Sequence, residues 1–162
     1  MRCSSVANTI HLAEVGEAWV LFRLAAHGIE AYRSAGGFAH VDIRAVEPRF
    51  DLQVKTATSP SWQLTTRDDD DAIAHSPTLF YVLVQLVPPS EHEATVDRAF
   101  VIPSAVVHQF SRAANRAWRA KHPDGKPRGR WLKESYGDLR VPAQLAPGYL
   151  DPYLDAWELL PT

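Results

Sequence analysis

Hydrophobic residues follow helical spacing at the start of the chain and strand spacing in its middle. Residues 9–27 predict a helix, with Asn8 or Thr9 as its N-cap and Gly28 as its C-terminal stop. One apolar stripe of this helix contains Leu12, Val15, Trp19, Phe22 and Ala26. A second stripe contains Ile10, Ala13, Leu21 and Leu24. Because apolar residues lie on two sides, the helix is expected to pack on both.

The next residues predict strands at 29–34, 40–46 and 50–57, with a turn at Pro48 between the last two because proline suits a turn. Residues 78–87, TLFYVLVQLV, are almost continuously apolar and predict a strand buried on both faces. The segment 58–77 between them predicts a loop with at most a short helix near Asp69 to His75. A strand at 98–102 and a helix from 103 to about 121 follow, and the aromatic tail YLDPYLDAWELL predicts an amphipathic helix folded back on the core.

This order of elements predicts an α/β (α+β) fold in one domain, residues 1–162, because helices and strands alternate along the chain. The composition agrees, since 46% of the 162 residues are hydrophobic and 22% are charged. Cys3 is the only cysteine, which excludes an internal disulfide and a multi-cysteine zinc site. The first ten residues contain no apolar signal-peptide core, and no apolar run is long enough to cross a membrane. We therefore expect a cytoplasmic protein that does not enter a membrane.

Charge is distributed unevenly although the net charge is only −2. The segment 112–133 carries eight basic residues against one acid, Asp124, which leaves −9 for the rest of the chain. The basic residues are Arg112, Arg116, Arg119, Lys121, Lys126, Arg128, Arg130 and Lys133. With Trp118 and Trp131 among them, these residues either contact a nucleic-acid backbone and stack on bases, or form a solvated helix followed by a polar loop.

Candidate chemistry centres on Asp42, Gln53 and Lys55. If the turn at 47–50 places Val46 opposite Asp51, Asp42 faces Lys55, and Gln53 lies on the same face of the sheet. These side chains form either a cross-strand salt bridge or a site for a hard cation such as Mg²⁺, which prefers oxygen ligands. In the second case, the adjacent lysine assists a bound water or stabilises charge on a phosphate.

Glu17 lies inside the second apolar stripe of the first helix, where an apolar residue is expected. A carboxylate there either lies at a half-exposed helix edge or needs a cation or a hydrogen-bonding partner. Glu14, one turn earlier, is the alternative carboxylate. A break in a local pattern of this kind favours a functional site.

Together these residues resemble the PD-(D/E)xK nuclease superfamily, in particular its Holliday-junction resolvase-like branch and related bacterial families. The resemblance rests on Gly16-Glu17 in a helix that ends at Gly28, Asp42 on a strand, and Gln53-Val54-Lys55 on the next strand. It covers residues 8–102, where it implies a restriction-endonuclease-like αβββαβ core with a central mixed sheet. Residues 103–162 are then a C-terminal helical extension.

The resemblance also implies roles for individual residues. Asp42 and Gln53 are expected to bind Mg²⁺ or Mn²⁺, the carbonyl of Val54 to add a third oxygen, Lys55 to position the nucleophile, and Glu17 to hold a metal-bound water. The departure from the pattern is Gln53, which is neutral where a carboxylate usually stands and which also occurs in active members of the superfamily. His40, on the strand of Asp42, is a further polar neighbour.

Three functions follow as hypotheses. The first is a metal-dependent endonuclease that hydrolyses phosphodiester bonds in DNA, including branched or RNA-containing DNA. The second is a catalytically inactive nuclease fold that binds nucleic acid or protein, which the neutral Gln53 favours. The third is a structural partner that forms a homodimer through Tyr149, Tyr153 and Trp157. The scattered histidines and the lack of phosphate-binding glycine motifs argue against a zinc hydrolase or a nucleotide-binding protein. The acidic run Asp68 to Asp71 is expected to be solvated.

Overall fold

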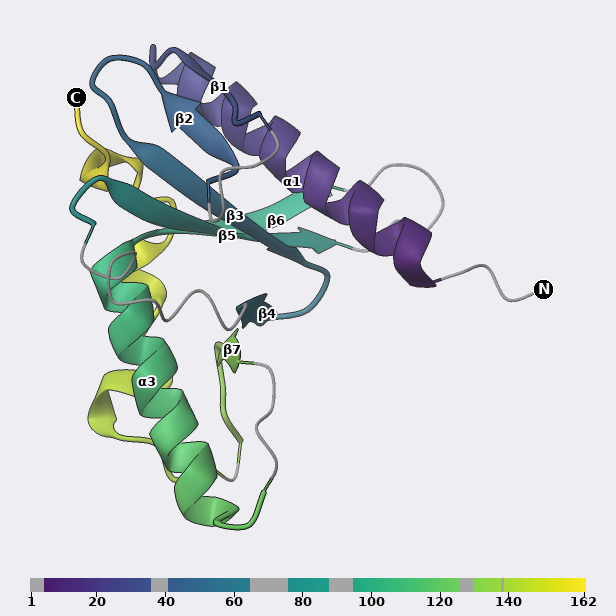
Figure 1. The fold of residues 1–162 in the computed structure, drawn as a ribbon, viewed down its shortest axis with the longest axis vertical. Helices are drawn as coiled ribbons and strands as arrows, with labels where there is room; N and C mark the ends of the chain where they lie inside the picture. Colours follow the sequence, from purple (N-terminus) through teal and green to yellow (C-terminus); the bar gives the residue numbers. More distant parts are fainter. Residues whose placement is uncertain (1–4, 36–40, 65–75, 88–94, 126–129, 138) are drawn as a thin grey trace.

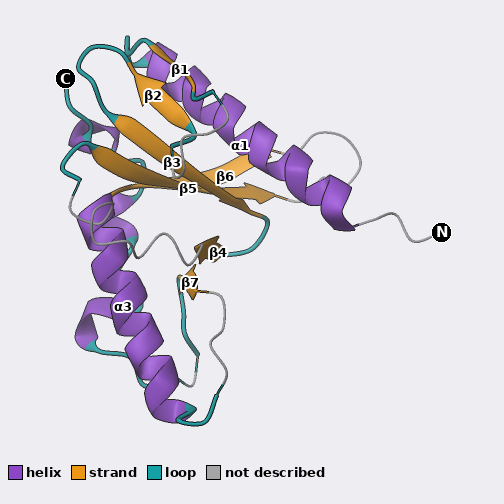
Figure 2. Cartoon of the chain, viewed as in Figure 1, coloured by secondary structure: helices purple, strands orange, loops and turns teal. Residues whose placement is uncertain are grey.

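The computed structural model describes residues 5–35, 41–64, 76–87, 95–125, 130–137 and 139–162 (Figure 1). Its long elements are a mixed sheet and the helices α1 and α3, which lie on opposite faces of that sheet (Figure 2). The elements are α1 (Ser5–Ala26), β1 (Ala31–Arg33), β2 (Ile43–Ala45), β3 (Asp51–Ala57), β4 (Ser61–Leu64), β5 (Leu79–Val87), β6 (Thr95–Pro103), α3 (Ser104–Lys121) and β7 (Arg130–Lys133). His40, the predicted short helix at Asp69 to His75 and the acidic run Asp68 to Asp71 lie outside the described residues.

Five strands form the central sheet in the order β1-β2-β3-β5-β6. The β3–β5 pair is parallel and the other neighbouring pairs are antiparallel, so the sheet is mixed, as predicted. The predicted strands all form. Their observed boundaries lie within two residues of the predicted ones, except that β2 starts later and β6 starts earlier than predicted. The α+β class predicted from the order of elements is confirmed.

The two faces of the sheet carry separate hydrophobic clusters. Helix α1 crosses one face, where Val20 and Leu24 pack against apolar residues of β3, β5 and β6. Helix α3 covers the other face with Val107 and Phe110 and then extends past the sheet alongside β7 (Figure 1). Strand β5 touches both clusters and is buried along almost its whole length, which explains its continuous apolar sequence.

Only part of the apolar surface of helix α1 is buried. Gly16, Val20 and Leu24 form its buried stripe, whereas Val15 and Phe22 are exposed, Phe22 by 67%. The predicted packing on both sides holds only in part: Leu12 and Trp19 of the first stripe are partly buried against the core, where the Trp19 ring lies 5.8 Å from that of Trp157, whereas Val15 and Phe22 stay exposed. The helix also begins at Ser5, before the predicted caps. Its predicted end is confirmed, since Gly28 has a φ of 75° and the Ile29 N–H donates to the Leu24 carbonyl at 2.9 Å.

A second, two-stranded sheet pairs β4 with β7, in residues that the sequence predicts to be loops. Trp62 and Leu132 lie opposite each other in this ribbon and are both buried. The Trp62 indole N–H donates to the Val84 carbonyl of β5 at 3.0 Å, which fixes the ribbon to the central sheet. Arg98 of β6 adds a bidentate ion pair with Glu134, at 2.6 and 2.8 Å.

The aromatic tail contains short 3-10 turns at Asp151–Tyr153 and Trp157–Leu159 instead of the predicted amphipathic helix. Pro152 and the positive φ of Asp155, 48°, interrupt α-helical geometry between them. The tail does fold back on the core, as predicted: Trp157 is 6% exposed and the Asp155 N–H donates to the Ala99 carbonyl at 2.9 Å.

Further contacts of the tail concern the residues named in the third hypothesis. Tyr149 and Tyr153 pack against Phe110 of the same chain, with ring centroids 4.8 and 6.1 Å away. The tail aromatics therefore contribute to this chain's own core, and a homodimer through them stays a prediction. Among the described residues, no helix combines the length and the apolar character needed to cross a membrane.

Candidate functional site

The register of β2 and β3 decides which candidate side chains meet. Arg44 lies opposite Asp51 and pairs with it, the Arg44 Nε to Asp51 Oδ1 distance being 2.7 Å. The predicted register, with Val46 opposite Asp51, is therefore wrong by two residues. The turn is as long as predicted but lies one residue earlier, because the Ala45 N–H donates to the Phe50 carbonyl at 2.9 Å and leaves residues 46–49, not 47–50, in the loop. A shift of two residues keeps each side chain on its face, so Asp42 lies beside Gln53 instead of opposite Lys55.

The Asp42 carboxylate connects the two strands. Its Oδ2 accepts one hydrogen bond from the Gln53 side-chain Nε2 at 2.9 Å and another from the Val54 backbone N–H at 2.7 Å. Hydrogen bonds to an ionised acceptor are about twice as strong as neutral ones. Asp42 is thus held just before the start of β2, where β3 continues past the end of its neighbour.

Gln53 is 7% exposed, and its Oε1 is buried without a hydrogen-bond partner. A buried polar atom left unpaired in this way costs about 1–3 kcal/mol. An amide carries both an oxygen and N–H donors, so a half-turn of the group presents either one to Asp42. The side chain therefore satisfies Asp42 with its N–H and keeps an oxygen of the type that hard cations bind.

The backbone of Val54 borders the same point. In an extended strand the N–H and the C=O of one residue point toward the same neighbouring strand. Since the Val54 N–H donates to Asp42, its carbonyl oxygen is directed to the same edge of β3. Asp42, Gln53 and Val54 thus provide a carboxylate, an amide oxygen and a backbone carbonyl within one short stretch of two strands.

Glu17 reaches this region from α1. Its side chain is 23% exposed, and its Oε2 lies 3.5 Å from the Arg33 Nε of β1. Burial raises the pKa of Glu17, and the nearby Asp42 carboxylate raises it further, whereas Arg33 lowers it. The two carboxylates therefore lie close enough to repel each other. Sequence reasoning missed Arg33, because a lone arginine in a short edge strand gives no signal of its own.

Gly16 explains how α1 comes so close to the sheet. It is buried, and a Cβ at this position would collide with Thr56 of β3, whose Cβ and Cγ2 would lie at 3.1 and 3.2 Å. Glycine is thus required by the close approach of helix and strand. The next residue, Glu17, is carried to the sheet edge by the same contact. Glu14, the alternative carboxylate, has a side chain 58% exposed and pairs with His11 at 3.7 Å, so it lies further out.

Lys55 is half-buried and lies in register with Leu83 of β5. Its side chain projects from the same face of β3 as Gln53, because strand side chains alternate. The described residues contain no group of three or more His, Cys, Asp or Glu side chains that could hold a metal. Two carboxylates with neutral oxygens suit Mg²⁺, which binds one or two carboxylates and keeps several waters, better than they suit zinc.

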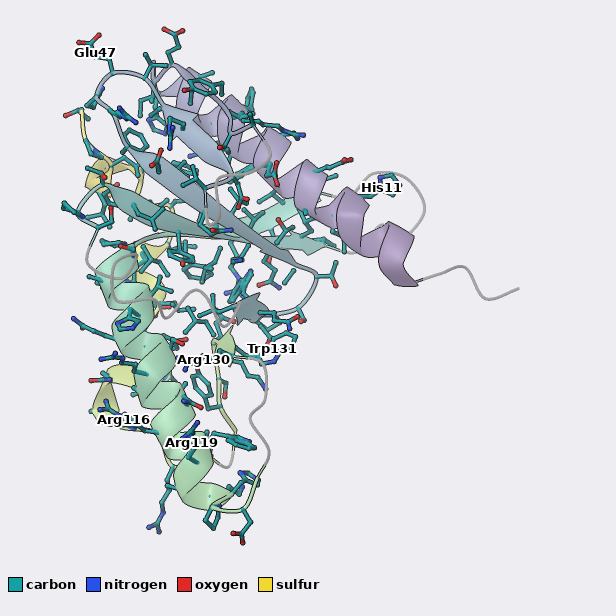
Figure 3. The ribbon with its side chains drawn as sticks, in the orientation of Figure 1. His11, Glu47, Arg116, Arg119, Arg130 and Trp131 are labelled. Atoms are coloured by element: carbon teal, nitrogen blue, oxygen red, sulfur yellow. The ribbon has the colours of Figure 1, made fainter. Side chains whose placement is uncertain are left out.

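The predicted nucleic-acid residues fall on two elements. Arg112, Arg116, Arg119 and Lys121 are exposed on α3, and Arg130 lies in β7. Figure 3 shows Arg116 and Arg119 on the part of α3 that extends past the sheet, with Arg130 and Trp131 on β7 beside it. Lys126 and Arg128 lie outside the described residues. On α3, Arg112, Arg116 and Arg119 are four and three residues apart, which places them on one side of the helix.

Two solved nuclease structures resemble the fold. A bacterial homing endonuclease is 14% identical in sequence with a TM-score of 0.46, and the match covers 91% of this chain and 87% of the homing endonuclease. The Holliday junction resolvase of the archaeal hyperthermophile Archaeoglobus fulgidus is also 14% identical, with a TM-score of 0.45 and coverage of 75% and 84%. No protein-family model matches the sequence, and no curated protein matches it. The assignment of the site therefore depends on the contacts within this chain.

Proposed function

We propose that this protein is a divalent-metal-dependent endonuclease that hydrolyses phosphodiester bonds in DNA. The observation that carries the proposal is the Asp42 carboxylate, which receives hydrogen bonds from Gln53 and Val54 beside a second carboxylate, Glu17. Two carboxylates that repel each other and a buried amide oxygen without a hydrogen-bond partner both lower the stability of the fold at this site. A bound cation would relieve both costs.

Each residue has a role in this proposal. Asp42, the Gln53 oxygen and the Val54 carbonyl hold Mg²⁺ or Mn²⁺, and Glu17 contributes from the other side. The ion, when bound, supplies the positive charge that polarises a phosphodiester. Lys55 lies two residues along the same strand face from Gln53, where its ammonium orients the attacking water and stabilises charge that develops on the phosphate oxygens.

The basic side of α3 supplies the contacts to DNA in this proposal. Its exposed arginines neutralise backbone phosphates without reading sequence, so binding weakens steeply as salt increases. A branched duplex offers phosphates in more than one direction and is the first substrate to test. Two active sites cut two strands, which makes a homodimer the assembly to look for.

A second candidate function is a nuclease fold that binds DNA without cutting it. The neutral side chain of Gln53 favours it, because an amide adds no negative charge to attract a cation. This candidate predicts salt-sensitive DNA binding that neither Mg²⁺ nor Mn²⁺ changes.

The test is cleavage of supercoiled plasmid and of a four-way DNA junction, with Mg²⁺ or Mn²⁺ and with EDTA. Asp42→Asn and Lys55→Ala are expected to abolish cutting while binding persists. Asp97→Asn and Arg49→Ala are the matched controls, because both residues are exposed and away from the site. Cutting that survives in both site variants refutes the proposed enzyme. Binding without cutting in the wild type establishes the second candidate.

A further inference from the structure

A pocket of about 380 Å³ lies between the C-terminal half of α3 and the segment that begins with β7. Asn115, Trp118 and Lys121 line it from the helix, and Arg130 and Tyr136 line it from the other side. Its volume is near the lower end of the range for ligand pockets, which suits a group about the size of one nucleotide. The pocket lies beyond the central sheet and does not include Asp42 or Gln53.

One wall of the pocket is a fixed aromatic surface. The Trp118 ring stacks on His122, with centroids 4.8 Å apart and planes 16° apart. The ring also rests against Gly125, where a Cβ would come within 2.6 Å of it. These contacts hold the indole in one orientation, so stacking a flat ligand on it costs little side-chain entropy.

The pocket is also basic. Lys121, Arg130 and Lys133 contribute positive charge, and none of the described residues that line it is Asp or Glu. Burial lowers the pKa of the Arg130 guanidinium, which means that the charge is partly removed from water. An aromatic wall beside cations without carboxylates favours a flat anionic ligand over a neutral or cationic one.

The surroundings favour a polymer over a free nucleotide. Arg112, Arg116 and Arg119 lie on the exposed side of α3, over the same stretch of the helix that lines the pocket. At 1.5 Å per helical residue, they lie about 6 Å and about 4.5 Å apart along the axis and form a row of positive charge that can contact successive phosphates. A strand that follows these arginines can place one base in the pocket.

We propose that the pocket between α3 and β7 receives an unpaired base of a DNA strand, stacked on Trp118, with its phosphate held by Lys121 and Arg130. The choice of DNA rests on the proposed function. The inference adds a substrate class, DNA that contains unpaired nucleotides, because a base paired inside a duplex cannot enter a pocket.

The test measures binding by fluorescence anisotropy in EDTA, where metal-dependent cleavage cannot occur. The probes are one DNA duplex with a single bulged thymidine and the same duplex with an abasic residue in the bulge, so both carry the same phosphates. The wild type is expected to bind the thymidine bulge about 5- to 150-fold more tightly, the equivalent of about 1–3 kcal/mol for one stacked base.

Variants assign this preference to the pocket. Trp118→Ala is expected to remove the preference, and Trp118→Phe to keep it because a ring remains. Asn115→Phe fills the pocket without removing its wall and is expected to have the same effect as Trp118→Ala, which covers the case in which Trp118→Ala does not fold. Arg116→Ala is the control: it weakens binding of both duplexes equally and keeps their ratio.

Equal affinity of the wild type for the two duplexes overturns the inference, as does a preference that survives both Trp118→Ala and Asn115→Phe. The outcome is separate from that of the proposed enzyme. A protein that prefers the bulged base and cuts nothing with Mg²⁺ refutes the nuclease and keeps the pocket. A protein that cuts DNA without preferring the base refutes the pocket alone.

Discussion

The contact between Gln53 and Asp42 predicts that Gln53→Glu makes folding strongly dependent on pH. The Gln53 Nε2 lies 2.9 Å from the Asp42 Oδ2, so the substitution puts two carboxylates in contact. Two unit charges about 4 Å apart repel by about 4 kcal/mol at an effective dielectric constant of about 20. This repulsion raises the pKa of the introduced carboxyl above its ordinary value.

The sign of the pH dependence follows from that raised pKa. A group whose pKa is higher in the folded state costs nothing below its unfolded pKa and its full penalty above its folded pKa. At pH 5, an ordinary glutamate gains only about 1 kcal/mol by ionising, so staying protonated costs the folded protein at most that amount. A protonated carboxyl also keeps a donor for Asp42. We expect the loss in free energy of unfolding to grow from about 1 kcal/mol at pH 5 to about 4 kcal/mol at pH 8.

Urea unfolding of wild type and variant at both pH values, followed by tryptophan fluorescence, measures this difference. Gln144→Glu is the matched control, because Gln144 is exposed and the same change there should leave stability within about 0.5 kcal/mol. Adding Mg²⁺ at pH 8 should stabilise Gln53→Glu more than the wild type, since a third carboxylate strengthens cation binding. A penalty of equal size at pH 5 and pH 8 would refute the contact between the two side chains.

Three further predictions concern the elements around the site. Gly16→Ala should lower the free energy of unfolding by about 1–3 kcal/mol through overpacking against Thr56. Adding Thr56→Ala to Gly16→Ala should restore part of this loss. An unchanged urea midpoint in Gly16→Ala would contradict the close approach of α1 to β3. Because the pKa of Glu17 is raised, Glu17→Gln should stabilise the protein increasingly as the pH rises above the ordinary glutamate range. The control Glu14→Gln, at an exposed residue, should show no such gain. Identical pH profiles for the two variants would exclude repulsion between Glu17 and Asp42. Trp157→Ala should lower the free energy of unfolding by about 3–5 kcal/mol, measured by thermal or urea unfolding. The control Leu159→Ala, at a residue 40% exposed, should lower it by about 0.5 kcal/mol or less. Comparable losses in the two variants would show that the tail does not pack on the core.

The sequence predicts the central strands well because each carries its own local signal. Leu79–Val87 is apolar except for Gln85 and lies between Pro77 and Pro88, so its start was predicted to within one residue and its end at the observed residue. The register of β2 and β3 was not, because the position of the turn along the chain depends on a hydrogen bond between Ala45 and Phe50. Patterns of alternation fix the face of a side chain, and a shift of two residues leaves that face unchanged.

Elements that depend on distant partners could not be predicted. Strands β4 and β7 have only four residues each and form because Trp62 and Leu132, far apart in the chain, are buried together. Val15 and Phe22 of α1 were predicted to be buried because they are apolar, but apolar residues are also common on surfaces. The pocket beside Trp118 could not be predicted either, because it forms only where β7 lies next to α3.

Glu17 and Gln53 are best understood together. Asp42 already has one carboxylate nearby, in Glu17, and Arg33 offsets that charge only partly, because the pKa of Glu17 remains raised. A glutamate in place of Gln53 would bring a third carboxylate into contact with Asp42, and the fold would then depend on a cation to offset the repulsion. The amide avoids that cost because its N–H group donates a hydrogen bond to Asp42. It also carries an oxygen without a hydrogen-bond partner, which could bind a cation. If the site binds a metal as proposed, the neutral residue would let it fold without the ion, at the cost of a lower affinity for the metal but with a ligand oxygen still present.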